Sequence, residues 1–366
     1  MKYFILAGEA SGDKQAALLC KSLRSLDRDA VMEGWGGEQM ILQGVNVTVH
    51  YSKLAFMGFV EIIKHLPAIL RNFKLCKKEI LAFNPDALIL VDYPGFNLRM
   101  ATWAHKQNIP VYYYISPQLW AWHTSRVFIV KKAVRRMYVI LPFEKEFYKN
   151  YGVDALYIGH PLAQEIQHET KEVHFPVKNQ VALLPGSRKH EVELILPVMV
   201  ALAAIEKKYS FKVVAVKHLP EKIYRDIIGS QENVELASGD MHATLYESEA
   251  AIVTSGTATL ETALLGTPQI VVYKGNKISY QLAKRLIKVP FISLVNLIAG
   301  KQLVPELIQK DFTPQKMKDA LDHVLANTSA IKQEYNALSD QLTSGGGPEA
   351  AAADIISDLH SIRKLQ

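Results

Sequence analysis

The chain has 366 residues, of which 49% are hydrophobic and 21% charged, and its formal net charge is +6. This length is too great for one typical core and predicts two domains, while the composition excludes a disordered chain. The two cysteines, Cys20 and Cys76, exclude a disulfide framework, and no apolar run reaches the roughly eighteen residues that a membrane span needs. Because Met1 leads almost directly into an apolar stretch, we expect no signal peptide and a cytoplasmic protein.

The first predicted unit is a strand, a loop and a helix. Residues 2–7 have the composition of a buried strand, and the loop 8–13 that follows contains Glu9 and Ser11. Its glycines spell neither a Walker loop nor a dinucleotide-binding motif. We therefore expect this loop to line a ligand cleft at the carboxyl end of the strand, where α/β sheets place their ligands.

Residues 59–83 have apolar side chains close to helical spacing, with lysines and arginines at the other positions. One interpretation is a helix that packs on the sheet and has a solvated basic face. The other is that part of the segment, around residues 60–70, lies in a membrane interface where its cations meet anionic lipid. Pro67 would break or start a helix there. The candidate membrane-facing residues are Val60, Ile62, Ile63, Leu66, Ile69 and Leu70.

Two further strands of this domain end in residues that suit catalysis or binding. Residues 86–92 form an apolar run that ends at Asp92, so this carboxylate is either a catalytic base at a strand's carboxyl end or a helix cap. Residues 111–115 lead into a loop that contains Gln118, Trp120, Trp122 and His123. Such loops are usually built from small polar residues, so this one could hold an amphiphilic substrate, unless Trp120 fills the core.

A second series of strands and helices follows the first. Strands over 137–141 and 156–158 complete the first domain, and the polar segment 164–180 is interpreted as a linker. Strand 181–184 then feeds the turn Gly186, Ser187, Arg188, and an arginine beside such a turn can present its planar guanidinium to a diphosphate. The remaining elements are strands over 212–216, 250–253 and 269–273 and a terminal helix over 349–365 that follows a glycine-rich break.

The turn after strand 250–253 is the strongest candidate for an anion site. Residues 254–259 are small and lead into a helix, so free backbone N–H groups and the positive end of the helix dipole meet there. Phosphate suits this site, and Glu261 is placed to accept hydrogen bonds from ribose hydroxyls. The alternative is an ordinary β-to-α turn with a Ser or Thr cap.

Positive charge is concentrated in two stretches of the chain. Residues 93–143 contain seven lysines and arginines and no Asp or Glu, and residues 262–305 contain six and again no acid. Two such basic faces suit phosphate-bearing ligands or an anionic membrane surface. Nucleic acid is the less favoured partner, because no nucleic-acid-binding module is visible.

Together these stretches resemble those of one family, the lipid-A-disaccharide synthases, which are glycosyltransferases at a membrane surface. The similar stretches are LAGEASGD (6–13), MGFVEI (57–62), VDYPGFN (91–97), YYISPQLWAWHTSRV (113–127), LPFEKEFY (141–148), LLPGSR (183–188), SGTATLE (255–261), LAKRL (282–286) and SLVNLIAG (293–300). They extend over nearly the whole chain in the expected order. The Trp-Ala-Trp loop and the joint presence of the others make the resemblance far more specific than any single glycine motif.

The resemblance implies an α/β fold of two Rossmann-like doubly wound domains that face each other across a cleft, as in GT-B transferases. We expect an acceptor- and membrane-facing domain over 1–165 and a UDP-sugar-binding domain over 178–342. The terminal helix, 348–366, would pack back on the first domain or on a partner.

The resemblance also implies a reaction and a set of site residues. UDP-2,3-diacylglucosamine is joined to 2,3-diacylglucosamine 1-phosphate through a β-1′,6 linkage, with inversion and release of UDP. Asp92 is carried over as the base. The UDP-binding residues are Gly186, Ser187, Arg188, Ser255, Gly256, Thr257, Glu261 and Asn296, and those on the acceptor side are Glu9, Ser11, Gln118, Trp120 and His123. No metal or cofactor is expected, because the helix terminus and Arg188 can supply positive charge. Gly95 departs from the family pattern, in which many members have an acid, and leaves Asp92 as the sole carboxylate candidate there.

Because the implied substrates are lipids, we favour the membrane interpretation of residues 59–83. We also expect the protein to be peripheral on the inner face of the inner membrane. Whether it forms a homodimer is left open. Two other functions stay open. One is a different GT-B transferase with a lipid-linked acceptor, which should lack the Trp120 and Trp122 loop. The other is a non-catalytic lipid-binding protein.

Overall fold

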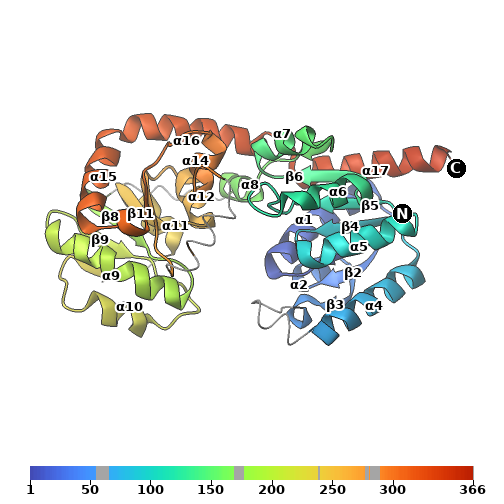
Figure 1. Ribbon diagram of the computed structural model, residues 1–366, viewed down its shortest axis with the longest axis horizontal. Coiled ribbons are helices and arrows are strands. Elements are labelled where there is room, and N and C mark those ends of the chain that lie inside the picture. Colours follow the sequence, from blue (N-terminus) through green and yellow to red (C-terminus); the bar gives the residue numbers. More distant parts are fainter. Residues whose placement is uncertain (55–65, 169–176, 238–239, 277–279, 281–288, 366) are drawn as a thin grey trace. The chain divides into compact units, whose positions relative to one another are not determined.

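A computed structural model describes residues 1–54, 66–168, 177–237, 240–276, 280 and 289–365, and its elements form two α/β units (Figure 1). One unit contains Met1–Pro161 and Leu342–Gln366, and the other contains Leu162–Gln341. The chain therefore leaves the first unit once, builds the second, and returns to the first at its end.

The first unit is built on a seven-stranded sheet with the order β3-β2-β1-β4-β5-β6-β7, in which all pairs are parallel. The order reverses between β1 and β4, which is the arrangement of a doubly wound sheet. The strands are β1 (Lys2–Ala7), β2 (Val31–Gly36), β3 (Asn46–His50), β4 (Ala87–Val91), β5 (Val111–Tyr114), β6 (Arg136–Val139) and β7 (Ala155–Tyr157).

The second unit is built on a six-stranded sheet with the order β10-β9-β8-β11-β12-β13, again parallel throughout. Here the order reverses between β8 and β11. The strands are β8 (Gln180–Leu184), β9 (Ser210–Val213), β10 (Val234–Leu236), β11 (Ala250–Thr254), β12 (Gln269–Tyr273) and β13 (Glu306–Ile308). The predicted α/β class with two doubly wound sheets is confirmed.

Helices connect the strands of both sheets. In the first unit these are α1 (Ala10–Leu26), α2 (Glu38–Leu42), α4 (Leu66–Phe83), α5 (Pro94–Lys106), α6 (Val127–Ala133) and α7 (Pro142–Asn150). The others are α8 (Pro161–His168), α9 (Lys189–Ile205), α10 (Glu221–Ile228), α11 (Met241–Tyr246), α12 (Thr257–Leu264), α14 (Leu294–Ala299), α15 (Pro314–Ala326), α16 (Thr328–Thr343) and α17 (Gly347–Leu365). Helix α8 occupies the start of the segment that we interpreted as a linker, so that prediction is wrong for 164–168; residues 169–176 lie outside the described part.

Both faces of the first sheet are buried, as expected for a parallel sheet with helices on each side. Successive side chains of β1 point to opposite faces, so Phe4 and Leu6 join one core cluster while Tyr3 and Ile5 join the other. Helices α4, α5 and α6 cover the first of these faces, and α1 and α17 cover the second. A strand with a continuous apolar run, such as β1 after Lys2, was predictable for this reason.

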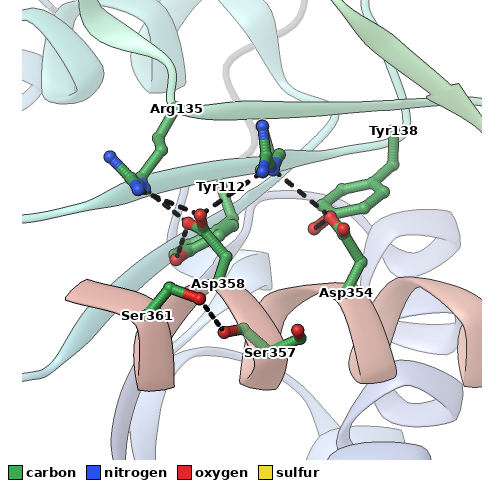
Figure 2. Close-up of polar contacts among 8 residues, drawn as sticks. Tyr112, Arg135, Tyr138, Asp354, Ser357, Asp358 and Ser361 are labelled. Atoms are coloured by element: carbon green, nitrogen blue, oxygen red, sulfur yellow. Dashed lines mark hydrogen bonds and ion pairs between the residues drawn. The ribbon is translucent and has the colours of Figure 1, made fainter. Parts of the chain in front are cut away.

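Helix α17 is held on the first unit by polar contacts at the edge of the sheet as well as by its apolar face (Figure 2). Asp358 accepts hydrogen bonds from the Tyr112 hydroxyl at 2.7 Å and from the Arg135 guanidinium at 2.9 Å, and Asp354 accepts one from Tyr138 at 2.8 Å. Burial opposes ionisation of Asp358, but the hydrogen bonds from Arg135 and Tyr112 and the charge of Arg135 outweigh it and lower its pKa. We call these contacts the α17 clamp.

Replacing Asp358 by Asn should lower the free energy of unfolding by about 2 kcal/mol at neutral pH, because Arg135 loses its charged partner. The folded pKa of Asp358 is lowered, so its contribution is present above the unfolded pKa and is lost as the pH falls through the folded value. Urea denaturation at several pH values measures this. Ser361→Ala is the matched control, because this exposed hydroxyl on the same helix only donates to the Ser357 carbonyl at 3.0 Å. A difference between Asp358→Asn and wild type that did not shrink in acid would contradict the assignment.

Candidate active site

Glu9 and Asp92 follow adjacent strands at the point where the order of the first sheet reverses. Glu9 lies in the short connection between β1 and α1, and Asp92 is the residue after β4. These strands pair in parallel, with Ala7 opposite Val91, so both side chains lie at the carboxyl edge of the sheet. This is the position at which doubly wound sheets bind ligands.

The backbone at Asp92 has an uncommon conformation that buried partners hold in place. Asp92 has φ +43° and Tyr93 has φ +46°, both in the left-handed region that costs energy for residues other than glycine. The Asp92 carbonyl accepts hydrogen bonds from the Tyr113 hydroxyl at 2.6 Å and from Asn97 Nδ2 at 2.8 Å. Asn97 is completely buried and also donates to the Val91 carbonyl. The structure therefore fixes the backbone from which the Asp92 carboxylate extends.

The electrostatic environment makes Asp92 a stronger base than an ordinary carboxylate. Burial and, next, the charge of Glu9 raise its pKa to about 6, although the Tyr93 amide opposes this by donating a hydrogen bond. A general base works best when its pKa lies near the operating pH. Asp92 is partly buried, whereas Glu9 is exposed. Ser11, in the first turn of α1, is exposed as well.

Gly8 makes the close approach between β1 and the Asp92 turn possible. A Cβ atom at Gly8 would lie 2.4 Å from the Tyr93 ring, whereas one at Gly95, in the first turn of α5, would meet nothing within 4 Å. The Tyr93 hydroxyl is also tied to the Leu54 carbonyl at 3.2 Å, so the ring cannot simply move aside. Any side chain at position 8 must therefore disturb the residue next to Asp92.

Gly8→Ala should destabilise the protein by about 1–3 kcal/mol, the usual effect of overpacking, and should lower kcat by displacing Asp92. Gly95→Ala is the matched control: there is space for the methyl group, and Ala is preferred to Gly in a helix by up to about 1 kcal/mol. Urea denaturation and steady-state kinetics on both variants check this. Equal effects of the two substitutions would show that the contact with Tyr93 is unimportant.

The Trp120 loop is anchored by a buried carboxylate that sequence reasoning missed. Trp120 Nε1 donates to Glu144 Oε1 at 3.1 Å, and Glu144 Oε2 accepts from the Leu141 amide at 3.0 Å. Burial raises the pKa of Glu144 to about 7 in spite of these hydrogen bonds. Trp120 is partly buried against Phe143, at a ring-centroid distance of 4.9 Å, so it anchors the loop. The sequence signal that could have found Glu144 is its position as the third residue of a helix that begins with proline.

Three other side chains of this loop are exposed and available to a ligand. Gln118 and His123 are exposed, and more than half of the Trp122 surface is accessible. Trp122 stacks against His123 with ring centroids 4.5 Å apart, and His123 has φ +56°. The acceptor-side candidates of this loop thus divide into an anchored Trp120 and accessible Gln118 and His123.

The second sheet brings Arg188 and the 255–257 turn to one edge. Arg188 follows β8 and Thr257 begins α12 after β11, and these strands pair in parallel at the reversal of the strand order. Gly256 and Thr257 are exposed, while the Ser255 hydroxyl donates to the Ile292 carbonyl at 2.9 Å. The amino ends of α9 and α12 therefore lie at the edge of the sheet where ligands bind.

Glu191 already occupies the amino end of α9. Its Oε2 accepts from the Ser187 and Arg188 amides at 3.1 and 3.3 Å, and its Oε1 lies 2.8 Å from the Arg188 guanidinium. Gly186 has φ +114°, and a Cβ there would lie 2.8 Å from Glu191. Arg188 itself is 81% exposed, so its guanidinium is accessible to a ligand.

The structure gives Glu261 and Asn296 partners within the protein. His242 Nε2 lies 3.0 Å from Glu261 Oε1. Asn296 is completely buried: its Nδ2 donates to Val304 and Glu306, and its Oδ1 accepts from the Leu303 and Val304 amides. Every polar group of that amide is satisfied, so the proposed donor site excludes the Asn296 side chain. Glu306 also accepts from the Ile292 amide at 3.0 Å and thereby supports the carbonyl that Ser255 contacts.

The membrane-facing candidates lie only partly within the described residues. Val60, Ile62 and Ile63 are outside them, as is the side chain of Leu66. Ile69 is partly buried against the core of the first unit, whereas Leu70 is 52% exposed. Among the described residues, no helix has the length and apolar character that crossing a bilayer requires.

Comparisons with known proteins place the whole chain among sugar transferases. The sequence profile of the lipid-A-disaccharide synthetase family matches residues 3–355. The lipid-A-disaccharide synthase of Syntrophus aciditrophicus is 40% identical over 365 residues, which covers 95% of each chain. That of Acidobacterium capsulatum is 38% identical over 359 residues, covering 92% of this chain and 90% of the relative.

Solved structures share the fold at low sequence identity. The glycotransferase of kitacinnamycin superposes with a TM-score of 0.67 at 13% identity and covers 98% of both chains. A putative UDP-N-acetylglucosamine 2-epimerase from Listeria monocytogenes has a TM-score of 0.63 at 14% identity, covering 100% of this chain and 97% of its own. These likenesses show the GT-B fold.

Proposed function

The chain belongs to the lipid-A-disaccharide synthase family, and from this premise we propose how its residues carry out the transfer. The activity is that of a glycosyltransferase in lipid A biosynthesis, with a UDP-sugar donor and a lipid acceptor. We propose in addition that the donor is UDP-2,3-diacylglucosamine and the acceptor 2,3-diacylglucosamine 1-phosphate, joined by a β-1′,6 linkage with inversion.

Asp92 is the base in this proposal. As the acceptor's 6-hydroxyl oxygen forms a bond to C1 of the donor sugar, its proton passes to the Asp92 carboxylate. The bond between C1 and the diphosphate breaks at the same time, and UDP leaves with the electron pair. The fixed backbone of Asp92 and its raised pKa support this role.

The second unit supplies the groups that accept charge on the leaving UDP. The backbone amide groups of the exposed residues Gly256 and Thr257 at the start of α12 and the exposed guanidinium of Arg188 are of the type that binds a diphosphate. Ser187, Gly186 and Ser255 shape the two turns. Glu261 binds the ribose and is oriented by His242.

The acceptor binds beside Asp92 at the carboxyl edge of the first sheet. Glu9, Ser11, Gln118 and His123 are its polar contacts, and the anchored Trp120 keeps their loop in place. The protein acts at the inner face of the inner membrane, where both substrates would be embedded. A homodimer remains a prediction, which light scattering on the purified protein would test.

The observation that carries the proposal is a carboxylate with a fixed backbone and a raised pKa at the switch point of a sheet. The test supplies purified protein with both substrates in detergent and measures UDP release together with disaccharide formation. An acceptor that lacks its 6-hydroxyl should give no product. Turnover only with a lipid-pyrophosphate acceptor would instead assign the chain a different substrate.

A further inference from the structure

Helices α5 and α6 present a surface that the reaction does not use. Their inward sides, with Met100 and Ala104 on α5 and Val127 and Val130 on α6, lie in one core cluster beneath the first sheet. The two helices lie side by side, with α4 beyond α5 (Figure 1). Their opposite sides therefore face outward together. We call this surface the α5–α6 face and define it by Thr102, His105, Lys106, Phe128, Ile129 and Lys132.

Large apolar side chains are exposed on this face. Phe128 is 61% exposed and Ile129 is 37% exposed, on the outward side of one short helix. The Phe128 ring meets Tyr151 edge-on, with centroids 6.0 Å apart, so it is held in place while most of it remains accessible. Adjacent exposed aromatic and β-branched residues on a soluble surface commonly mark an interaction site.

The charge around these apolar residues is positive. Residues 93–143 contain no Asp or Glu, so neither helix can neutralise its own cations. His105, Lys106 and Lys132 are exposed at the carboxyl ends of the two helices. Asp358, the carboxylate that Arg135 contacts, is already held in the α17 clamp. The face therefore attracts anions.

Two adjoining hollows lie between the carboxyl ends of α5 and α6. One, of about 420 Å³, is lined by residues that include Lys106, Phe128, Ile129 and Lys132. The other, of about 450 Å³, shares His105 and Lys132 and reaches Arg135. Hollows of this size suit a phosphate headgroup with its linked glycerol. They lie where β5 and β6 begin, at the edge opposite Asp92, so they are separate from the acceptor site.

The geometry of the α5–α6 face favours an extended anionic surface over a single small anion as its ligand. Helix carboxyl ends carry partial negative charge and offer no free N–H groups, so only side-chain cations can hold a phosphate here. One phosphate would then bind weakly. A bilayer presents many phosphates to the cations and an acyl boundary to Phe128 and Ile129. The binding free energies of the two kinds of contact are then summed over the whole face. Nucleic acid would match the cations but not the exposed Ile129.

We propose that the α5–α6 face docks on an anionic phospholipid bilayer, with lipid headgroups in the two hollows and Phe128 and Ile129 at the acyl boundary. The proposal deepens the proposed synthase function, whose lipid acceptor must be taken from a membrane, and rests on it. Contact through the sides of helices leaves the edge that carries Asp92 free to receive substrate.

The experiment measures binding of the full chain to phosphatidylcholine vesicles with and without phosphatidylglycerol. One variant replaces Phe128 and Ile129 by Ser, and a second is Lys132→Glu. Lys132→Glu should weaken binding to the anionic vesicles roughly 30-fold, because a basic residue near the surface contributes about 1 kcal/mol and charge reversal doubles the change. The Phe128 and Ile129 variant should weaken it at least about tenfold, because two apolar side chains no longer enter the acyl boundary. The matched controls, Leu42→Ser on α2 and Lys21→Glu on α1, replace exposed residues elsewhere and should bind as wild type does.

A second measurement separates this proposal from the proposed function. Turnover of substrates in detergent should be the same in wild type and both face variants, because the face lies away from Asp92, whereas turnover on vesicles should fall. Unchanged vesicle binding in folded variants would overturn the docking surface and leave the synthase function intact. Displacement of the protein from vesicles by millimolar inorganic phosphate would overturn the docking surface too. So would face variants that change the oligomeric state but still bind vesicles. Failure of the wild type to turn over substrates in detergent counts against the proposed function alone.

Discussion

Asp92→Asn is expected to lower kcat by about 10²–10⁴-fold, the usual contribution of a positioned general base, and at neutral pH to make the folded protein more stable. Activity falls because the amide cannot take the proton from the acceptor hydroxyl. Stability rises because the substitution removes a charge that the folded state places in a poorly solvated site. Opposite effects on activity and stability are typical of a functional residue and unusual for a structural one.

The stability effect has a definite dependence on pH. In the unfolded chain the carboxyl of Asp92 has the ordinary pKa of about 3.9, whereas in the folded protein burial and the charge of Glu9 raise the pKa to about 6. Above this pH the carboxylate is ionised in both states and destabilises the fold, by an amount on the order of 2–3 kcal/mol. As the pH falls toward 4 the folded state takes up the proton first, so the advantage of Asp92→Asn should disappear.

Kinetics on Glu9→Gln provide a check on the same carboxylate. For wild type, kcat/KM should fall as the pH is lowered through about 6, where Asp92 becomes protonated. Removing the charge of Glu9 should lower the pKa of Asp92 and move this acid limb to lower pH. Thermal denaturation measures the stability of Asp92→Asn, and pH–rate profiles measure the position of the acid limb. An unchanged acid limb in Glu9→Gln, or full activity in Asp92→Asn, would rule out Asp92 as the base.

Most strands were predictable from the sequence, including the edge strand β7, whereas β2, β3, β10 and β13 were not. Strands β1, β4, β8 and β11 are buried on both faces, so each reads as a short continuous apolar run. Strand β2 contains Gly34, where a Cβ would lie 2.0 Å from the Ile5 carbonyl oxygen. A glycine required by such a close approach looks like a loop residue in the sequence alone. The edge strands β3 and β13 are mostly half-buried and lack an apolar run.

The candidate site was predictable where topology alone decides the position. Asp92 and the 255–257 turn follow predictable strands, and parallel strands bring their carboxyl ends to one edge. The residues that orient the site could not be found this way. Glu144 lies 24 residues from Trp120, His242 lies 19 residues from Glu261, and Glu306 lies 14 residues from Ile292, and these pairings exist only in the folded chain. Asn296 shows the converse, because its motif suggested a ligand and its buried amide bonds to backbone groups and to Glu306 instead.

Arg188→Ala is expected to lower kcat/KM by about 10²–10³-fold, comparable to the loss of one donor that stabilises charge in a transition state. Negative charge grows on the diphosphate as its bond to the sugar breaks, so most of the loss should appear in kcat. The fold should be nearly unaffected, because the guanidinium is 81% exposed and its contact among the described residues is an exposed pair with Glu191. Such pairs contribute about 0–1 kcal/mol.

Two further substitutions distinguish a diphosphate contact from a general effect of charge. Arg188→Lys keeps the charge but loses the planar fork that can bind two phosphate oxygens, so it should recover only part of the activity. Lys189→Ala removes one cation from the next position on α9, where the side chain is 62% exposed, and should leave kcat close to that of wild type. Steady-state kinetics with varied donor concentration measure all three variants. If Lys189→Ala were as damaging as Arg188→Ala, the loss would reflect the field of the basic surface, and Arg188 would have no specific contact with the leaving group.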